Sequence, residues 1–245
     1  MKNHLLTALE VHHWPFNKKR LGKDNDGGYV ICDIPKIEYD LFLAGGISTD
    51  ISFEEDFLNH YPNVPCYAFD HSIEKLPEKV RGGNIIYSKN INFVKKKIGK
   101  QETDEETNLI SHLENYKNVF LKLDIEHAEY DLWEVLTSAH LNCIAQVAIE
   151  MHPTKLTKFE NFILKTHETH ELFHVHCNNA ICPITHSYNI EGVIMPGLLE
   201  LTYVRKDLLN FSLEPNTTQL PSDLDMPNVR SRDDVSLNYY PFVVK

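Results

Sequence analysis

The run from Val119 to Glu129, VFLKLDIEHAE, most constrains what this chain can fold into. It opens with aliphatic and aromatic residues, which is typical of a buried strand. Three carboxylates follow, at Asp124, Glu126 and Glu129, and a pattern with helical spacing begins at Ala128. A strand that ends in acids and leads into a helix is typical of an open α/β sheet, in which ligands bind beyond the carboxyl ends of the strands. The run therefore predicts an α/β fold with Asp124 at the ligand-binding edge.

Strand and helix patterns alternate from residue 41 to about residue 152, and two further strand patterns follow Pro153. This order predicts a doubly wound, Rossmann-like sheet that is mostly parallel, with an antiparallel edge strand. The first helix starts with a capping-box pattern, Ser52 followed by Glu55. The expected strands are 41–45, 66–70, 84–87, 119–124, 145–151, 172–177 and 198–204, and the expected helices begin at Ser52 or cover 105–116, 128–136 and 155–168.

We interpret residues 1–245 as a single domain, because a chain that is 42% hydrophobic and of this length can bury one core. Residues 1–38 predict a short amphipathic helix and a hairpin whose turn contains Gly27 and Gly28. The Rossmann-like core covers 39–208. Residues 209–245 are rich in Pro, Asn, Asp and Ser, which predicts an irregular C-terminal arm.

The formal net charge of −11 argues against nucleic acid and anionic membrane surfaces as partners, because both attract basic proteins. The five cysteines are odd in number, which favours a reducing compartment. The N-terminus lacks an apolar segment of signal length, and no run approaches the roughly 20 apolar residues of a membrane span. We therefore expect a soluble, cytoplasmic protein. The sequence leaves its oligomeric state open.

Two more strand ends suggest a nucleoside-binding crevice. Gly45 and Gly46 end the strand 41–45 and allow the backbone to approach a ligand closely. Asp70 ends the next strand, at the distance of one strand-helix-strand unit, and is placed to accept both hydroxyls of a ribose. The glycines do not form the dinucleotide motif G-x-G-x-x-G. A methyl-donor nucleoside has no pyrophosphate to bind, so a looser glycine turn is sufficient for it.

The segments that carry these residues resemble a known group of enzymes. The stretches 26–29 (DGGY), 44–54 (AGGISTDISFE), 68–70 (AFD) and 121–129 (LKLDIEHAE) are similar to the FkbM-type and methyltransferase-like domain families. The similarity continues through 149–152, 174–179 and 200–204, and on to 225–228 and 241–242. It departs at His127, where the family pattern has glycine, and in the short glycine string at Gly45 and Gly46.

The resemblance implies a class I methyltransferase fold and an S-adenosylmethionine-dependent O-methyltransferase. Its acceptor would be a hydroxyl of a small polar molecule, with a sugar or glycan as the leading class. Asp124 would face both the sulfonium and the acceptor. The residues implied in cofactor binding are Gly45, Gly46, Ser48, Asp70, His71 and Asp124.

An alcohol is a poor nucleophile at neutral pH, so the reaction needs a base or a metal Lewis acid. Asp124, Glu150 and His152 end two adjacent predicted strands and fit either role, as catalytic residues or as ligands of Mg²⁺ or Mn²⁺. The candidates for acceptor contacts are His176, Asn178 and Tyr29.

Structural alternatives exist for these residues. Asp124 is also a good cap for the helix that follows, and Glu126 and Glu129 suit the first turn of that helix. His152 and His176 fit structural roles as well. At the level of function, the short glycine turn and His127 favour a non-catalytic nucleoside-binding module. A nicotinamide-dependent sugar-modifying enzyme shares the fold, but the missing third glycine argues against it.

Overall fold

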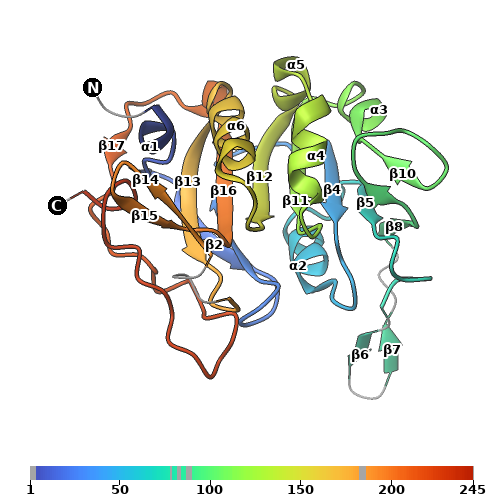
Figure 1. The fold of residues 1–245 in the computed structure, drawn as a ribbon. Helices are drawn as coiled ribbons and strands as arrows, with labels where there is room; N and C mark the ends of the chain where they lie inside the picture. Colours follow the sequence, from blue (N-terminus) through green and yellow to red (C-terminus); the bar gives the residue numbers. More distant parts are fainter. Residues whose placement is uncertain (1–3, 78, 82–83, 87–89, 182–185, 245) are drawn as a thin grey trace.

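The computed structural model describes residues 4–77, 79–81, 84–86, 90–181 and 186–244. A seven-stranded sheet in the order β13-β16-β12-β11-β4-β5-β8 forms its centre (Figure 1). The strands are β4 (Leu41–Gly45), β5 (Cys66–Phe69), β8 (Ile91–Val94), β11 (Val119–Leu123), β12 (Ile144–Met151), β13 (His170–Cys177) and β16 (Leu199–Arg205). The predicted α/β class and mostly parallel sheet are therefore confirmed.

The sequence pattern predicted an antiparallel strand at the edge of the sheet, and the structure places this strand elsewhere. β16 pairs antiparallel with both β12 and β13, so it lies one position inside the sheet and β13 forms the edge. The hairpin β14 (Ser187–Ile190) and β15 (Val193–Pro196) precedes β16 along the chain. The length of chain between Cys177 and Leu199 allows β16 to return between two strands that are already parallel to each other.

Both faces of the sheet are covered. Side chains alternate along each strand, so Phe120 of β11 packs toward one face and Leu121 toward the other. Helix α2 (Ser52–His60) and the hairpin β2 (Asn17–Leu21) and β3 (Tyr29–Asp33) pack on the Phe120 face. Helices α1 (His4–Ala8), α4 (Ala128–Val135) and α6 (Leu156–His167) cover the Leu121 face (Figure 1). The N-terminal hairpin is thus confirmed.

Short elements complete the described residues. Three small pairings are β1 (His12–His13) with β17 (Glu214–Pro215), β6 (Lys79–Arg81) with β7 (Asn84–Ile86), and β9 (Lys97–Ile98) with β10 (Glu106–Thr107). The short helices are α3 (Ile110–Leu113), α5 (Ser138–Leu141) and the 3-10 turn η1 (Lys206–Leu208). No helix among the described residues is long and apolar enough to cross a membrane.

Three local predictions were wrong. A strand of the central sheet was expected at 84–87, but residues 84–86 pair with β6 in a separate hairpin. The strand next to β5 in the sheet is β8. Residue 87 lies outside the described residues. The helix expected over 105–116 is only α3, because Glu106 and Thr107 pair with β9 and Leu109 has a left-handed φ of 60°. Ser52 is the first residue of α2 rather than its cap, and its hydroxyl accepts the Lys23 N–H at 2.9 Å.

The C-terminal arm is attached to the sheet by two histidines of β13. His174 Nε2 pairs with Asp225 Oδ1 at 2.8 Å, and His176 Nε2 pairs with Asp234 Oδ1 at 3.0 Å. His174, His176 and Asp225 are buried or nearly so. The arm therefore packs beside the carboxyl end of β13.

Candidate active site

The candidate site lies where the direction of the chain through the sheet reverses. From β4 the chain proceeds outward to β5 and β8, and it then returns to β11 on the other side of β4. Ligands of open α/β sheets bind at such a switch point, beyond the carboxyl ends of the strands. A cavity of about 460 Å³ lies there, which is within the usual range for a small-molecule site. Its lining includes Gly46, Ser48, Asp70, His71, Ser72 and Asp124.

Five residues predicted to bind the cofactor therefore line one cavity. Gly45 is buried behind it at the end of β4. Gly46 requires the absence of a side chain, because its φ is +74° and a Cβ atom would lie 1.6 Å from the carbonyl oxygen of Asp124. A second cavity, of about 210 Å³, lies between α4 and α6, away from these residues.

Asp70 presents an ionised carboxylate to the cavity. Its Oδ2 accepts the Ser48 N–H at 2.8 Å, and its Oδ1 accepts the N–H and hydroxyl of Ser72 at 2.7 and 2.6 Å. Burial opposes the charge, but these hydrogen bonds outweigh it and lower the pKa of Asp70. A carboxylate can accept about four hydrogen bonds, so one position remains for a ligand hydroxyl.

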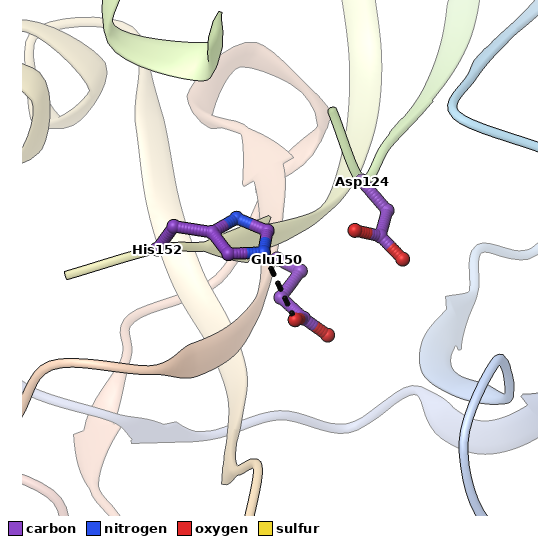
Figure 2. Close-up of side chains that lie close together, drawn as sticks. All are labelled: Asp124, Glu150 and His152. Atoms are coloured by element: carbon purple, nitrogen blue, oxygen red, sulfur yellow. Dashed lines mark ion pairs between the residues drawn. The ribbon is translucent and has the colours of Figure 1, made fainter. Parts of the chain in front are cut away.

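Asp124, Glu150 and His152 form a compact cluster beside this cavity (Figure 2). Each offers one oxygen or nitrogen atom, and these atoms lie within 4.8 Å of one another. The cluster forms because Leu123 of β11 pairs with Ile149 of β12. Asp124, directly after β11, therefore lies beside Glu150, the last residue but one of β12. Asp124 also lines the cavity, which connects the cluster to the predicted cofactor pocket.

His152 is oriented by a buried carboxylate. Its Nδ1 lies 2.9 Å from Glu129 Oε1, and its Nε2 lies 3.5 Å from Glu150 Oε1 and 3.3 Å from the exposed Glu126. Burial disfavours the charged imidazolium, but the hydrogen bond and charge of Glu129, helped by Glu150 and Asp124, raise the pKa of His152 to about 9. In this arrangement His152 is a cation at neutral pH rather than a free base.

Glu150 and Asp124 are held by neutral hydrogen-bond donors. Asn178 Nδ2 donates to Glu150 Oε2 at 3.1 Å, and the Tyr29 hydroxyl donates to Asp124 Oδ2 at 3.3 Å. Burial, with the charges of Asp124 and Glu200, raises the pKa of Glu150 well above its ordinary value. Burial and Asp124 likewise raise the pKa of Tyr29. Two of the three predicted acceptor residues therefore contact the cluster directly.

His176, the third predicted acceptor residue, contacts other side chains. Its Nδ1 lies 2.8 Å from Glu200 Oε2, and its Nε2 faces Asp234 of the arm. Burial favours the neutral ring, but Asp234 and Glu200 raise the pKa of His176 to about 10. Both ring nitrogens are thus engaged within the protein, and a contact between His176 and the acceptor remains a prediction.

The alternative role of Asp124 as a helix cap is not supported. Helix α4 begins at Ala128, and its N-cap is His127 in a left-handed conformation with φ of 77°. Asp124 lies before this cap and faces the cavity. Glu129 does lie in the first turn of α4, but its buried carboxylate binds His152. Its role is therefore more specific than a favourable interaction with the helix dipole.

Several polar residues of the site were not identified from the sequence. Glu200 lies between two leucines in β16, and a charged residue in an apolar strand is only a weak indication of a functional site. Asn228 and Asp234 lie in the arm, where no periodicity indicated what they would contact. Asn228 Nδ2 donates to Glu200 Oε1 at 2.7 Å.

A scan against models of known protein families found no match, and a search of curated proteins found no significant match either.

Proposed function

We propose that this protein is an S-adenosylmethionine-dependent O-methyltransferase that acts on a hydroxyl of a small polar acceptor, with a sugar or glycan as the leading class. The observation that carries the proposal is the position of Asp124. It lines the cavity at the switch point of the sheet and also belongs to the cluster with Glu150 and His152. A methyl-transfer site needs this combination, because a nucleoside pocket must open directly onto groups that can accept a proton.

The cavity has features that suit the nucleoside part of such a cofactor. Gly46 lets the main chain lie against the backbone of Asp124 at the cavity wall, and the remaining acceptor position of Asp70 suits a ribose hydroxyl. Ser48 and His71 line the same space. When bound, S-adenosylmethionine would supply a methyl group on a sulfonium centre, and the carboxylate of Asp124 would favour that positive charge.

The cluster would activate the acceptor. A carboxylate of the cluster would take the hydroxyl proton of the acceptor. A bound methyl donor would supply the methyl group to the acceptor oxygen and leave as the neutral thioether S-adenosylhomocysteine. Glu150 suits this task better than His152, because His152 already carries the proton that it shares with Glu129. Tyr29 and Asn178 hold the two carboxylates in place. Neutral donors and acidic oxygens side by side also suit a polyol, which supports a sugar or glycan as acceptor.

Calorimetric titration with S-adenosylhomocysteine tests the proposal. The wild-type protein is expected to bind it with one saturable site, and Asp70→Ala is expected to lose that binding because the ribose contact is removed. Asp104→Ala removes an exposed carboxylate outside the cavity lining and should bind as the wild type does. Asp124→Asn should bind the ligand but fail to turn over an acceptor.

The outcome also separates the alternatives. If the wild type does not bind S-adenosylhomocysteine, the methyltransferase proposal fails. Preference for NAD would instead support the nicotinamide-dependent enzyme. Cofactor binding without transfer to any acceptor in a panel of sugars and glycans would support a non-catalytic module.

A further inference from the structure

We infer that Asp124, Glu150 and His152 bind one divalent metal ion, with Glu129 as the residue that orients the histidine ligand. The inference deepens the proposed function and rests on it only for the role of the ion, which would be to polarise the acceptor hydroxyl. The geometry of the site stands independently of that role. It can be tested without any methyl donor.

The three side chains form a suitable set of donors. Two carboxylates and one imidazole come from the ends of adjacent strands, and their donor atoms lie within 4.8 Å of one another. Two donor atoms bound to one ion of the size of Mg²⁺ can be at most about 4.2 Å apart. Movements of a few tenths of an ångström, within the range of side-chain adjustment, would therefore bring the atoms into contact with a single ion.

The histidine has the environment of a metal ligand. In many metal sites a ligating imidazole donates its other N–H to a carboxylate, which fixes the tautomer and the orientation of the ring. Here Glu129 contacts Nδ1 of His152 at 2.9 Å. The other ring nitrogen, Nε2, faces Glu150 (Figure 2). The Tyr130 hydroxyl donates to the carbonyl oxygen of His152 at 2.7 Å and holds the backbone in place. An ion would bind at Nε2.

Glu129 provides an observation that is independent of the three ligands. It is fully buried, and its Oε2 has no hydrogen-bond donor among the described residues. Its Oε1 contacts His152 Nδ1 and accepts the Ile125 N–H at 3.3 Å, and a buried carboxylate is costly without such partners. Its position behind His152 is explained if it orients a histidine that carries a cation on the opposite nitrogen.

The charge around the cluster also requires compensation. Glu150 faces Asp124 on one neighbouring strand and pairs directly with Glu200 on the other. Glu150 and Glu200 are each 6% exposed. His152 and His176 lie nearest to these carboxyl groups, and each ring also contacts a further one, Glu129 or Asp234. A divalent ion between Asp124 and Glu150 would lie at the centre of this group of carboxyl side chains.

The mixed donor set favours Mn²⁺ as the probe. Carboxylates suit Mg²⁺ and Mn²⁺, whereas imidazole suits borderline transition metals, and Mn²⁺ accepts both. Three protein ligands leave further coordination positions open. Because Asp124 also lines the cavity, these open positions would face the space in which the proposed cofactor and acceptor meet.

The experiment is titration of the purified full chain with MnCl₂, followed by the electron paramagnetic resonance signal of free Mn²⁺. We expect one saturable site per chain. His152→Ala and Glu150→Gln should each weaken binding at least about 10-fold, and Glu129→Gln should weaken it about 10- to 100-fold through loss of orientation. Two matched controls should bind as the wild type does. They are Glu134→Gln on the outer side of α4, and His13→Ala at an exposed position.

Far-ultraviolet circular dichroism of every variant verifies that it is folded, and Asp124→Asn replaces any ligand variant that is not. Absence of saturable binding in the wild type would overturn the inference. Binding that is unchanged in the folded ligand variants would overturn it too, since the ion would then lie elsewhere on the acidic surface. Loss of Mn²⁺ binding in Glu134→Gln would also overturn the inference, because it would place the ion on the outer side of α4.

The inference and the proposed function fail separately. Binding of Mn²⁺ without binding of S-adenosylhomocysteine would support the metal site and contradict the methyltransferase. Binding of S-adenosylhomocysteine without Mn²⁺ would leave a methyltransferase in which the carboxylates act without a metal.

Discussion

Glu150 of β12 lies directly opposite Glu200 of β16 in the antiparallel pairing, and both side chains are buried. Like charges at directly opposed positions normally destabilise a sheet. Here each carboxylate has its own partners. Glu150 accepts a hydrogen bond from Asn178, and Glu200 contacts His176 and Asn228. The arm thus contributes to the stability of the site, since Asn228 belongs to it.

Replacement of Glu200 tests this arrangement. Glu200→Ala leaves His176 with one carboxylate partner and removes the nearer acceptor of Asn228 Nδ2, whose other acceptor is Asp26 Oδ1 at 3.4 Å. The free energy of unfolding should therefore fall by about 3 to 5 kcal/mol. Glu200→Gln keeps an acceptor oxygen and should cost less. Urea unfolding monitored by tryptophan fluorescence measures both changes. A loss below about 1 kcal/mol for Glu200→Ala would show that the contacts of Glu200 contribute little.

His176 should make stability depend on pH in the alkaline range. Its pKa is raised from 6.5 to about 10 by Asp234 and Glu200 against the effect of burial. A group whose pKa is higher in the folded state binds its proton more tightly there. Its contribution is therefore complete below pH 6.5 and is lost as the pH rises toward 10. The free energy of unfolding should decline over this window by an amount on the order of a few kcal/mol, and His176→Gln should flatten the decline.

His170 provides the control, because it lies on the same strand and has the opposite shift. Burial lowers the pKa of His170 to about 4, so this ring is neutral in both states above pH 7. His170→Gln should change the free energy of unfolding by the same amount at every pH between 7 and 10. If the free energy of unfolding fell equally steeply with pH in His170→Gln and His176→Gln, the charge of His176 would not be the cause of the decline. His152 contributes to the wild-type decline in the same range, and both variants retain it.

Two glycine substitutions separate backbone strain from a steric clash. Gly46 and Gly192 both have positive φ, at +74° and +87°, but a Cβ atom would meet the carbonyl of Asp124 at 1.6 Å in Gly46 and nothing within 4 Å in Gly192. Gly192→Ala should cost about 1 kcal/mol from backbone strain alone. Gly46→Ala should cost about 3 kcal/mol or more and abolish binding of S-adenosylhomocysteine. Thermal unfolding and calorimetry measure these effects, and equal losses in the two variants would contradict the close approach at Gly46.

The sequence predicts the sheet well where strands are apolar and end in a marked residue. β4, β5 and β11 end at the glycine turn, at Asp70 and at Asp124, and the structure brings these ends together at one cavity. This succeeds because parallel strands place their carboxyl ends at one edge, so the position of a residue along the chain determines where it lies in space.

Other features depend on contacts that a single segment does not encode. β8 is short and partly polar, and it forms a strand because β5 pairs with it. The position of β16 between β12 and β13 depends on how the chain returns to the sheet, which residue patterns do not reveal. The contacts of Glu200 with Asn228 join residues that are far apart in sequence. Periodicity and local motifs carry no information on such pairs.

Lys122 is a buried lysine next to the last residue of β11, and the other residues of this strand are apolar. Its Nζ donates to the carbonyl of Gly46 at 3.2 Å and lies 5.6 Å from the centre of the Tyr29 ring. Burial raises the pKa of Glu54, and the charge of Lys122 acts in the opposite direction. Lys122 thus supports the glycine turn and compensates a buried carboxyl at the same time.

Lys122→Met should therefore lower the free energy of unfolding by about 3 kcal/mol, because it leaves Glu54 buried without its cation. Adding Glu54→Gln should recover part of the loss, since the second change removes the uncompensated carboxyl. Urea unfolding of the two single variants and the double variant gives their coupling energy, which should exceed about 1 kcal/mol. Strict additivity would show that Lys122 acts through Gly46 and Tyr29 alone. In that case Lys122→Met would still weaken binding of S-adenosylhomocysteine, because the turn that lines the cavity would lose its support.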